Sequence, residues 1–359
     1  MQISISDPIF ATQLFSLIFF IALLVSQRRK KSDAVGTLSI ETTNELKGFA
    51  IIAILFAHIG YYLAADHRFL FPLSVLAGVG VDLFLFLSGF GLATSALMRP
   101  LSIQQFYTRR LAKIYVPLAL SLAIFFSLDF LILHKTYGWL YTLRSFLGYF
   151  PSANLYTDIN SPLWYITLIV FYYLLFPVIF SKKRVILSAL GIYAVTYALS
   201  WWPPIGFHNN MPLYAMHFLA FPLGILRAVA SQKWPRMCVI RNQWLYVAAV
   251  VSLIAAIAHF AIHSGVGKGH WIAEGMSIFT VFLILTLFTI SRHEFRLFSL
   301  FGVFSFEIYL LHWPILYRYD MLFKFLPAWL AAVLYLPVFI GLAWLFSRGV
   351  QWLDTRFSR

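Results

Sequence analysis

Two polar residues on one apolar segment are the first candidates for chemistry in this sequence. Lys47 and His58 flank residues 48–57, which are apolar throughout. In a helix, eleven residues at about 100° each return the chain to within about 20° of its starting direction, so both side chains share one face roughly 16 Å apart. Polar groups are expensive in hydrocarbon and usually face a bundle interior or a wet cavity. We therefore predict that His58 is a functional residue and that Lys47 lies nearer the membrane surface.

A carboxylate lies in the next apolar segment. Within residues 78–91, Gly78, Asp82 and Gly89 align at helical spacing. Small residues at such spacing are also ordinary packing surfaces between membrane helices. A buried carboxylate, however, needs a compensating partner. We expect Asp82 to pair with a cation or to orient an imidazole, and His58 is the ring it would hold.

A third group of polar residues lies in residues 305–314. Ser305, Tyr309 and His312 fall on one helical stripe, whereas Glu307 is turned about 200° from Ser305 and need not face the same cavity. His312 precedes a Trp-Pro pair, so a capping or interfacial role competes with a role in an active site. The other ionisable residues within apolar segments fall near predicted helix ends, where an interfacial role is expected: Asp129, His217 and His259.

Three cations are concentrated in residues 106–117, an expected inner loop that leads into a Pro-containing helix: Arg109, Arg110 and Lys113. Juxtamembrane cations often serve only to set topology or to contact anionic lipid. Together with Lys47, they would also form a receptor for a polyanion such as the phosphates of coenzyme A. Both interpretations stay open from the sequence.

The composition of the whole chain indicates that these residues lie in a membrane protein. It has 359 residues, 61% hydrophobic and 11% charged, with a mean hydropathy of +0.81. Its apolar runs are too long and too many for a soluble core. The sequence predicts an all-α, polytopic helical bundle of about eleven spans, near residues 9–26, 48–64, 73–97, 111–133, 163–180, 184–200, 212–229, 244–262, 271–290, 299–317 and 327–346.

The positions of Lys and Arg predict the orientation of these spans. Most of the 27 cations fall in one alternate set of junctions. The opposite side holds only Arg68, Lys135, Arg144, Lys268, Arg318 and Lys324. We therefore expect the amino terminus outside and the carboxyl terminus in the cytoplasm.

Several other classes of protein are disfavoured. The net charge of +14 comes mainly from short juxtamembrane loops without a nucleic-acid-binding motif, so no nucleic-acid partner is expected. The single Cys238 offers neither a disulfide framework nor a metal cluster, and no metal is expected. The first span has its cations after it and is expected to be a retained helix. We expect one domain, residues 1–359, made of an extra N-terminal helix at 9–26 and a core at 41–346.

The longest expected outer loop, residues 134–162, is rich in Tyr and Trp with Asn and Asp nearby. Such residues suit the stacking and hydrogen bonding of sugars, but they are equally typical of an interfacial aromatic belt. The belt is the favoured interpretation for most of them.

Five segments, taken in order, resemble acyltransferase family 3, a family of integral membrane proteins that acylate sugars and other acceptors. They are Lys47 with His58 as a basic-x10-His pair, residues 80–90, residues 106–117, residues 161–165 with 171–177, and residues 305–314. Three departures stand out. The family's usual Arg is Lys47 here, a Glu that many members carry after Trp164 is replaced by the apolar run 166–170, and the first helix is additional.

The resemblance implies an O-acyltransferase that moves an acyl group, commonly acetyl, from cytoplasmic acyl-CoA to a glycan hydroxyl, in a bacterial cytoplasmic membrane. The acceptor would be a cell-surface glycan such as O-antigen or a lipid-linked sugar, and a homo-oligomer is left open. In this interpretation Lys47, Arg109, Arg110 and Lys113 hold the acyl-CoA. The acceptor contacts Trp164, Tyr165, Tyr309 and His312.

For catalysis we expect His58 to act as a general base, Asp82 to orient its ring, and Glu307 to be a speculative acid. Direct transfer is preferred because no nucleophile elbow or Cys-His pattern is present. The competing hypothesis is a proton-coupled transporter, in which the intramembrane His and carboxylates relay protons. A catalytically inactive scaffold is disfavoured because both Lys47 and His58 are retained.

Overall fold

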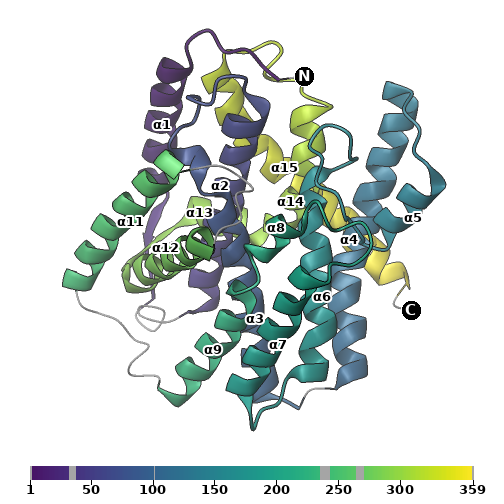
Figure 1. Cartoon of the computed structure of the whole chain (residues 1–359). Helices are drawn as coiled ribbons and strands as arrows, with labels where there is room; N and C mark the ends of the chain where they lie inside the picture. Colours follow the sequence, from purple (N-terminus) through teal and green to yellow (C-terminus); the bar gives the residue numbers. More distant parts are fainter. Residues whose placement is uncertain (1, 32–37, 101, 235–242, 264–270, 358–359) are drawn as a thin grey trace.

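The structure is a computed structural model that describes residues 2–31, 38–100, 102–234, 243–263 and 271–357. Cys238 and Lys268, both considered in the sequence, lie outside these ranges. The described residues form a bundle of helices with a single two-stranded sheet (Figure 1). The shorter elements are β1 (Gln27–Arg29), a π-helical turn (His58–Leu63), 3₁₀ turns (Leu73–Val75 and Ser161–Leu163), α5 (Trp139–Phe146), α8 (Met211–Ala215) and β2 (His293–Phe295).

Each of the eleven predicted spans coincides with a helix or a bent helix pair. Among the described residues, nine helices are long and apolar enough to cross a membrane, a bent pair forms a tenth candidate, and α7 is a shorter apolar helix. The elements are α1 (Pro8–Val25), α2 (Ile40–Ala57), α3 (Ala77–Met98), α4 (Ile103–Leu133), α6 (Trp164–Ile179), α7 (Val185–Trp201), α9 (Ala220–Lys233), α11 (Gln243–His263), α12 (Trp271–Ile290), α13 (Arg296–Val303) with α14 (Ser305–Tyr317), and α15 (Ala328–Phe357). The prediction of an all-α polytopic membrane bundle is confirmed.

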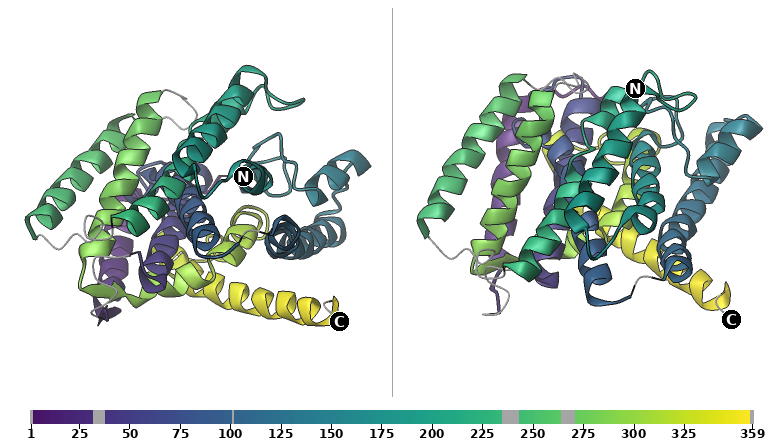
Figure 2. Two further views of the ribbon diagram at one scale, coloured as in Figure 1. Left: turned by 90° about the horizontal axis from the view of Figure 1, so that it is seen from below. Right: turned by 60° about the horizontal axis from the view of Figure 1, so that its bottom comes forward.

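The N-terminal residues and the end of α15 lie at opposite ends of the bundle (Figure 2, right). The eleven crossings predicted from the sequence would give this arrangement, because an odd number of spans puts the two termini on opposite sides of the membrane. Which end faces the cytoplasm stays a prediction that rests on the distribution of Lys and Arg.

Local sequence signals fix where several helices begin. The Asp7 side chain accepts a hydrogen bond from the Phe10 N–H at 3.0 Å, directly before Pro8 at the first position of α1. The Ser39 hydroxyl accepts from the Thr42 N–H at 3.1 Å and caps α2 in the same way. Each cap satisfies a backbone donor that the helix itself cannot pair.

The prediction of an inner loop at residues 106–117 is wrong, because these residues are helical. Ser102 caps a helix that begins at Ile103 and continues through Pro117 to Leu133 as α4. No glycine or proline interrupts residues 103–116, so the helix extends beyond the predicted start of the span at 111. Arg109, together with the cations that follow it, is therefore held on a helix.

The predicted tenth span, 299–317, is also not one straight helix. It is divided into α13 and α14, which meet at 80° next to Phe304. The α13 segment is packed closely on α2, since a Cβ added at Gly302 would lie 1.8 Å from the Asn44 carbonyl oxygen. Helix α13 packs against α2, and because of the bend the axis of α14 points in a different direction from that of α13.

Helices α3 and α9 also cross at close range, with a glycine on each helix at the crossing. An added Cβ at Gly89 would lie 2.2 Å from the Phe221 carbonyl oxygen, and one at Gly224 would lie 2.0 Å from the Phe86 carbonyl oxygen. Glycine is therefore required at both positions. The sequence suggested such a packing surface on α3, and α9 is the helix that occupies it.

Helix α2 lies in the interior of the bundle and α11 at its edge. Within their most apolar windows, 72% of the α2 residues and 11% of the α11 residues are buried by protein. In Figures 1 and 2, α11 lies beside α12 on one flank of the molecule. The polar residues that α2 carries are thus enclosed by neighbouring helices.

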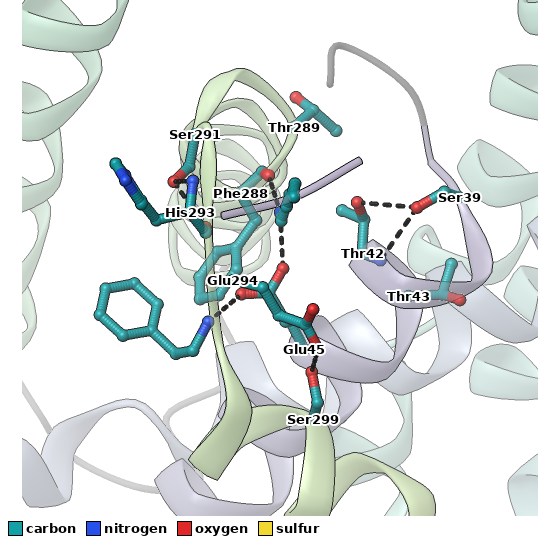
Figure 3. A network of polar contacts seen from close by, with 12 residues as sticks. Ser39, Thr42, Thr43, Glu45, Phe288, Thr289, Ser291, His293, Glu294 and Ser299 are labelled. Atoms are coloured by element: carbon teal, nitrogen blue, oxygen red, sulfur yellow. Dashed lines mark hydrogen bonds and ion pairs between the residues drawn. The ribbon is translucent and has the colours of Figure 1, made fainter. Parts of the chain in front are cut away.

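A buried ion pair fastens the small sheet to α2. Strands β1 and β2 pair antiparallel, and the Lys30 ammonium that follows β1 lies 2.5 Å from the Glu45 carboxylate, with both side chains fully buried. The same ammonium donates to the Phe288 carbonyl oxygen at 2.8 Å, and Glu45 accepts from the Phe295 N–H at 2.8 Å. Figure 3 shows Glu45 among these contacts and the neighbouring Ser39 to Thr42 cap. This network joins α2, α12 and β2.

Candidate active site

His58 lies where α2 changes to a π-helical turn. The turn occupies His58–Leu63, and a Cβ added at Gly60 would lie 2.5 Å from the Phe69 carbonyl oxygen, so the following chain packs tightly on it. Such π-helical turns occur frequently at functional sites. The ring of His58 faces His312 of α14 at a centroid distance of 4.8 Å and also contacts Trp313 at 5.2 Å.

Hydrogen bonds to backbone carbonyls, and one between the two histidines, fix the proton positions in the neutral rings. Nδ1 of His312 donates to the carbonyl oxygens of Tyr309 at 2.8 Å and Ile308 at 3.1 Å, because carbonyl oxygens only accept. Nε2 of His312 is then an acceptor, and it lies 3.3 Å from Nδ1 of His58. That Nδ1 also donates to the Ile54 carbonyl oxygen at 2.9 Å. The proton of His58 is therefore on Nδ1, and its Nε2 carries the free electron pair.

The His58 ring lines a cavity of about 340 Å³. Aromatic side chains form much of its wall, including Tyr62, Trp164, Tyr165 and Tyr309. The wall also carries several polar side chains from α3, α12 and the segment before α9. An apolar chamber with a few polar groups is typical of a small-molecule site.

Asp82 lines the same cavity but does not hold His58. Its Oδ1 accepts from Nδ1 of His217 at 2.7 Å, and its Oδ2 accepts from the Ser277 hydroxyl. The carboxylate does orient an imidazole, as expected. The prediction that this imidazole is His58 is wrong, because His312 and a backbone carbonyl occupy that role.

The cations predicted to bind the donor lie together. Lys47, Arg110 and Lys113 line a second cavity of about 630 Å³ between α2, α4 and neighbouring helices. Arg109 lines a third cavity of about 560 Å³, which shares Lys113 with the second. Helix α4 carries Arg109, Arg110 and Lys113, and α2 carries Lys47.

The Lys47 cavity adjoins both the His58 cavity and the Arg109 cavity. The His58 cavity and the Lys47 cavity have four lining residues in common: Ile54, Val81, Tyr165 and Tyr309. The Lys47 cavity and the Arg109 cavity have Lys113, Phe306 and Glu307 in common. A row of cavities therefore extends from the cations to the imidazole, along the face of α2 that carries Lys47 and His58.

Glu307 is not beside His58. It lines the two cation cavities, whereas the His58 cavity does not include it. Its separation by about 200° from Ser305 around the helix does not keep it out of the Lys47 cavity, which both residues line. The speculative role as an acid in the reaction chamber is not supported by this position.

The four residues expected to contact the acceptor lie around the His58 cavity. Trp164 and Tyr165 begin α6 and line the cavity, and the Tyr309 hydroxyl donates to the Pro162 carbonyl oxygen. His312 is fully buried behind His58 rather than on the cavity wall. His312 is therefore placed to act through His58 and not on a bound molecule.

Two residues of the chamber were not assigned to the site from the sequence. His217 lies near a helix end, as expected, but it is 3% exposed and paired with Asp82 rather than interfacial. Its intramembrane position was the available signal. Ser277 gave no signal, since one Ser in an apolar helix is common.

Part of the expected outer loop is held in place by Arg318. Arg318 forms a buried ion pair with Asp129, hydrogen bonds to Tyr137 at 2.5 Å and donates to the Asp158 carbonyl oxygen. Burial and the hydrogen bond to Asp129 raise the pKa of Tyr137 above its ordinary value. Several loop aromatic residues thus have structural partners, whereas Trp139 is 77% exposed, as an interfacial residue would be.

Comparisons with known proteins agree with this arrangement. A family model described as an acyltransferase domain matches residues 44–348, nearly the whole core. No curated protein and no solved structure matches the chain. The match includes Lys47, His58 and every residue that lines the His58 and Lys47 cavities, and the chain therefore belongs to acyltransferase family 3.

Proposed function

We propose that this membrane acyltransferase moves an acyl group, with acetyl as the expected case, from cytoplasmic acyl-CoA to a hydroxyl of a cell-surface or lipid-linked glycan. The expected location is a bacterial cytoplasmic membrane. The observation that carries the proposal is the row of cavities that begins at Lys47 and Arg110 and ends at His58, whose Nε2 has no hydrogen-bond partner among the described residues. A phosphorylated thioester requires cations at one end and a base at the other.

The cations would hold the donor. Lys47, Arg110 and Lys113 line one cavity, and no carboxylate other than Glu307 is among its lining residues in the described part of the chain. Charge-assisted hydrogen bonds to phosphate are strong in such partly enclosed positions. The separation of about 16 Å along α2 leaves room for the pantetheine arm to extend toward His58.

His58 would act as the general base. Its Nε2 takes the proton of the acceptor hydroxyl as that oxygen attacks the thioester carbonyl carbon. A C–O bond forms, the C–S bond breaks, and the imidazolium returns the proton to the departing sulfur. His312 keeps the proton of the resting ring on Nδ1, so that Nε2 is available. Transfer is direct, with no acyl group on the protein.

The proposal is tested with purified protein in lipid vesicles and radiolabelled acetyl-CoA. Consumption of acetyl-CoA that depends on His58 supports transfer. Proton-coupled uptake of a solute without any consumption would instead support the transporter hypothesis, which the family match disfavours. Mass spectrometry of surface glycans from cells with and without the gene then identifies the acceptor.

A further inference from the structure

The reaction chamber contains a second imidazole that the proposed mechanism does not use. His217 precedes α9, and its Nδ1 lies 2.7 Å from Asp82 Oδ1, while Ser277 of α12 donates to Asp82 Oδ2. His217 is 3% exposed and Asp82 is fully buried. All three residues line the 340 Å³ cavity that also contains His58.

This group is a costly feature for a membrane bundle. Replacing a buried polar pair by well-packed apolar residues is often neutral or stabilising, so stability alone does not explain why the pair is present. It joins α3, α12 and the segment before α9, and it directs one ring nitrogen of His217 away from Asp82. Within the described residues, no hydrogen bond reaches Nε2 of His217. That nitrogen is available to a molecule in the cavity.

The hydrogen-bonding character of this nitrogen follows from its partners. The Asp82 carboxylate only accepts hydrogen bonds, so in the neutral form of the His217 ring the proton is on Nδ1. Nε2 then presents an electron pair and accepts a hydrogen bond from a hydroxyl group. The Trp164 ring, stacked on His217 at 5.5 Å and 23°, holds the imidazole in this orientation.

We propose that His217 binds a hydroxyl group of a polyhydroxylic acceptor and so contributes to acceptor specificity, with Asp82 and Ser277 as positioning residues. This inference rests on the proposed function. The aromatic walls at Trp164 and Tyr165 provide apolar surface for the C–H face of a sugar ring, as aromatic side chains commonly do. A volume of about 340 Å³ suits one sugar residue rather than an extended chain.

The proposal predicts a particular effect of Asp82→Asn. An asparagine amide at this position can donate to Nδ1 of His217, which moves the ring proton to Nε2 and converts an acceptor into a donor. The side-chain volume is almost unchanged. His217→Ala removes the ring entirely, whereas His217→Gln keeps an oxygen near the place of Nε2 and should restore part of the preference.

The experiment uses the full-length protein in phosphatidylcholine vesicles with acetyl-CoA and two acceptor probes. Octyl β-D-glucopyranoside, below its micellar concentration, offers several hydroxyls, and 1-octanol offers one on the same alkyl chain. The measured quantity is the ratio of kcat/KM for the glucoside to kcat/KM for octanol. We expect this ratio to fall about tenfold in His217→Ala and in Asp82→Asn, the loss expected for one hydrogen bond.

A control variant accompanies the experiment, and its results distinguish failure of this inference from failure of the proposed function. His293→Ala removes an exposed histidine on β2, remote from the cavity lining, and should leave the ratio unchanged. An unchanged ratio in both His217→Ala and Asp82→Asn would overturn the inference, as would a wild type that hydrolyses acetyl-CoA but has no preference for the glucoside. A wild type that consumes no acetyl-CoA at all would overturn the proposed function itself.

Discussion

Replacement of Lys47 by Ala tests the donor site in a way that separates phosphate binding from a general structural effect. Lys47 shares a cavity of about 630 Å³ with Arg110 and Lys113. If it donates one charge-assisted hydrogen bond to a phosphate of acyl-CoA, its loss costs about 1.5–3 kcal/mol. At about 1.4 kcal/mol per factor of ten, KM for acetyl-CoA should rise about 10- to 150-fold.

The assay compares acetyl-CoA with acetylpantetheine, which has the same thioester but no phosphate. In Lys47→Ala, KM for acetyl-CoA should rise by this factor, while KM for acetylpantetheine should change less than about twofold. Lys183→Ala provides the control, because Lys183 is an exposed cation in the connection between α6 and α7 and lines none of the three cavities. It should leave both values unchanged.

Two results would refute the reasoning. An equal rise in KM for both donors would mean that Lys47 supports the fold of the site and does not contact phosphate. Unchanged values for both donors would remove Lys47 from the donor site altogether, and the cavity would then have to bind acyl-CoA through α4 alone.

Three further predictions concern catalysis and stability. His312→Ala should lower kcat about 10- to 100-fold with KM for acetyl-CoA nearly unchanged, since His58 loses the partner that orients it, and a steady-state comparison would show this. A rise in KM alone would contradict it. Gly224→Leu should lower stability by about 1–3 kcal/mol or more in thermal unfolding, because its Cβ would overlap a backbone carbonyl of α3, and an unchanged unfolding temperature would count against the close crossing. Arg318→Ala should cost about 3–5 kcal/mol by leaving Asp129 buried and uncompensated, and adding Asp129→Asn should recover part of that loss; no recovery would exclude the charge as the cause.

The sequence predicted the features that depend on spacing within one segment. The eleven-residue separation of Lys47 and His58 placed both on one face of α2, and the cavities that each residue lines do adjoin. The apolar runs likewise predicted the helices, because the length of a membrane span is set by the thickness of the bilayer.

Features that depend on contacts between distant segments were not predictable in this way. Asp82 clearly required a partner, but nothing local distinguishes His217, 135 positions away, from His58. The 80° bend between α13 and α14 is also a tertiary feature, and the sequence alone left His312 between an interfacial role and a role in the site.

The hydrogen bond between His312 and His58 explains how the His58 ring keeps its proton on Nδ1 and leaves Nε2 to act as a base. Backbone carbonyls of α14 set the proton position in His312, and His312 together with a carbonyl of α2 sets it in His58. No carboxylate is needed for this relay of hydrogen bonds. Asp82 instead accepts hydrogen bonds from His217 and Ser277 in the wall of the same cavity.

The most direct test of the account is the rate of acetyl transfer by His58→Ala in vesicles, measured together with equilibrium binding of radiolabelled CoA to the same preparation. Loss of a general base should lower the rate about 10²- to 10⁴-fold, while CoA binding stays within about twofold of wild type because the cations are untouched. A transfer rate within tenfold of wild type would contradict the assignment of His58 as the base.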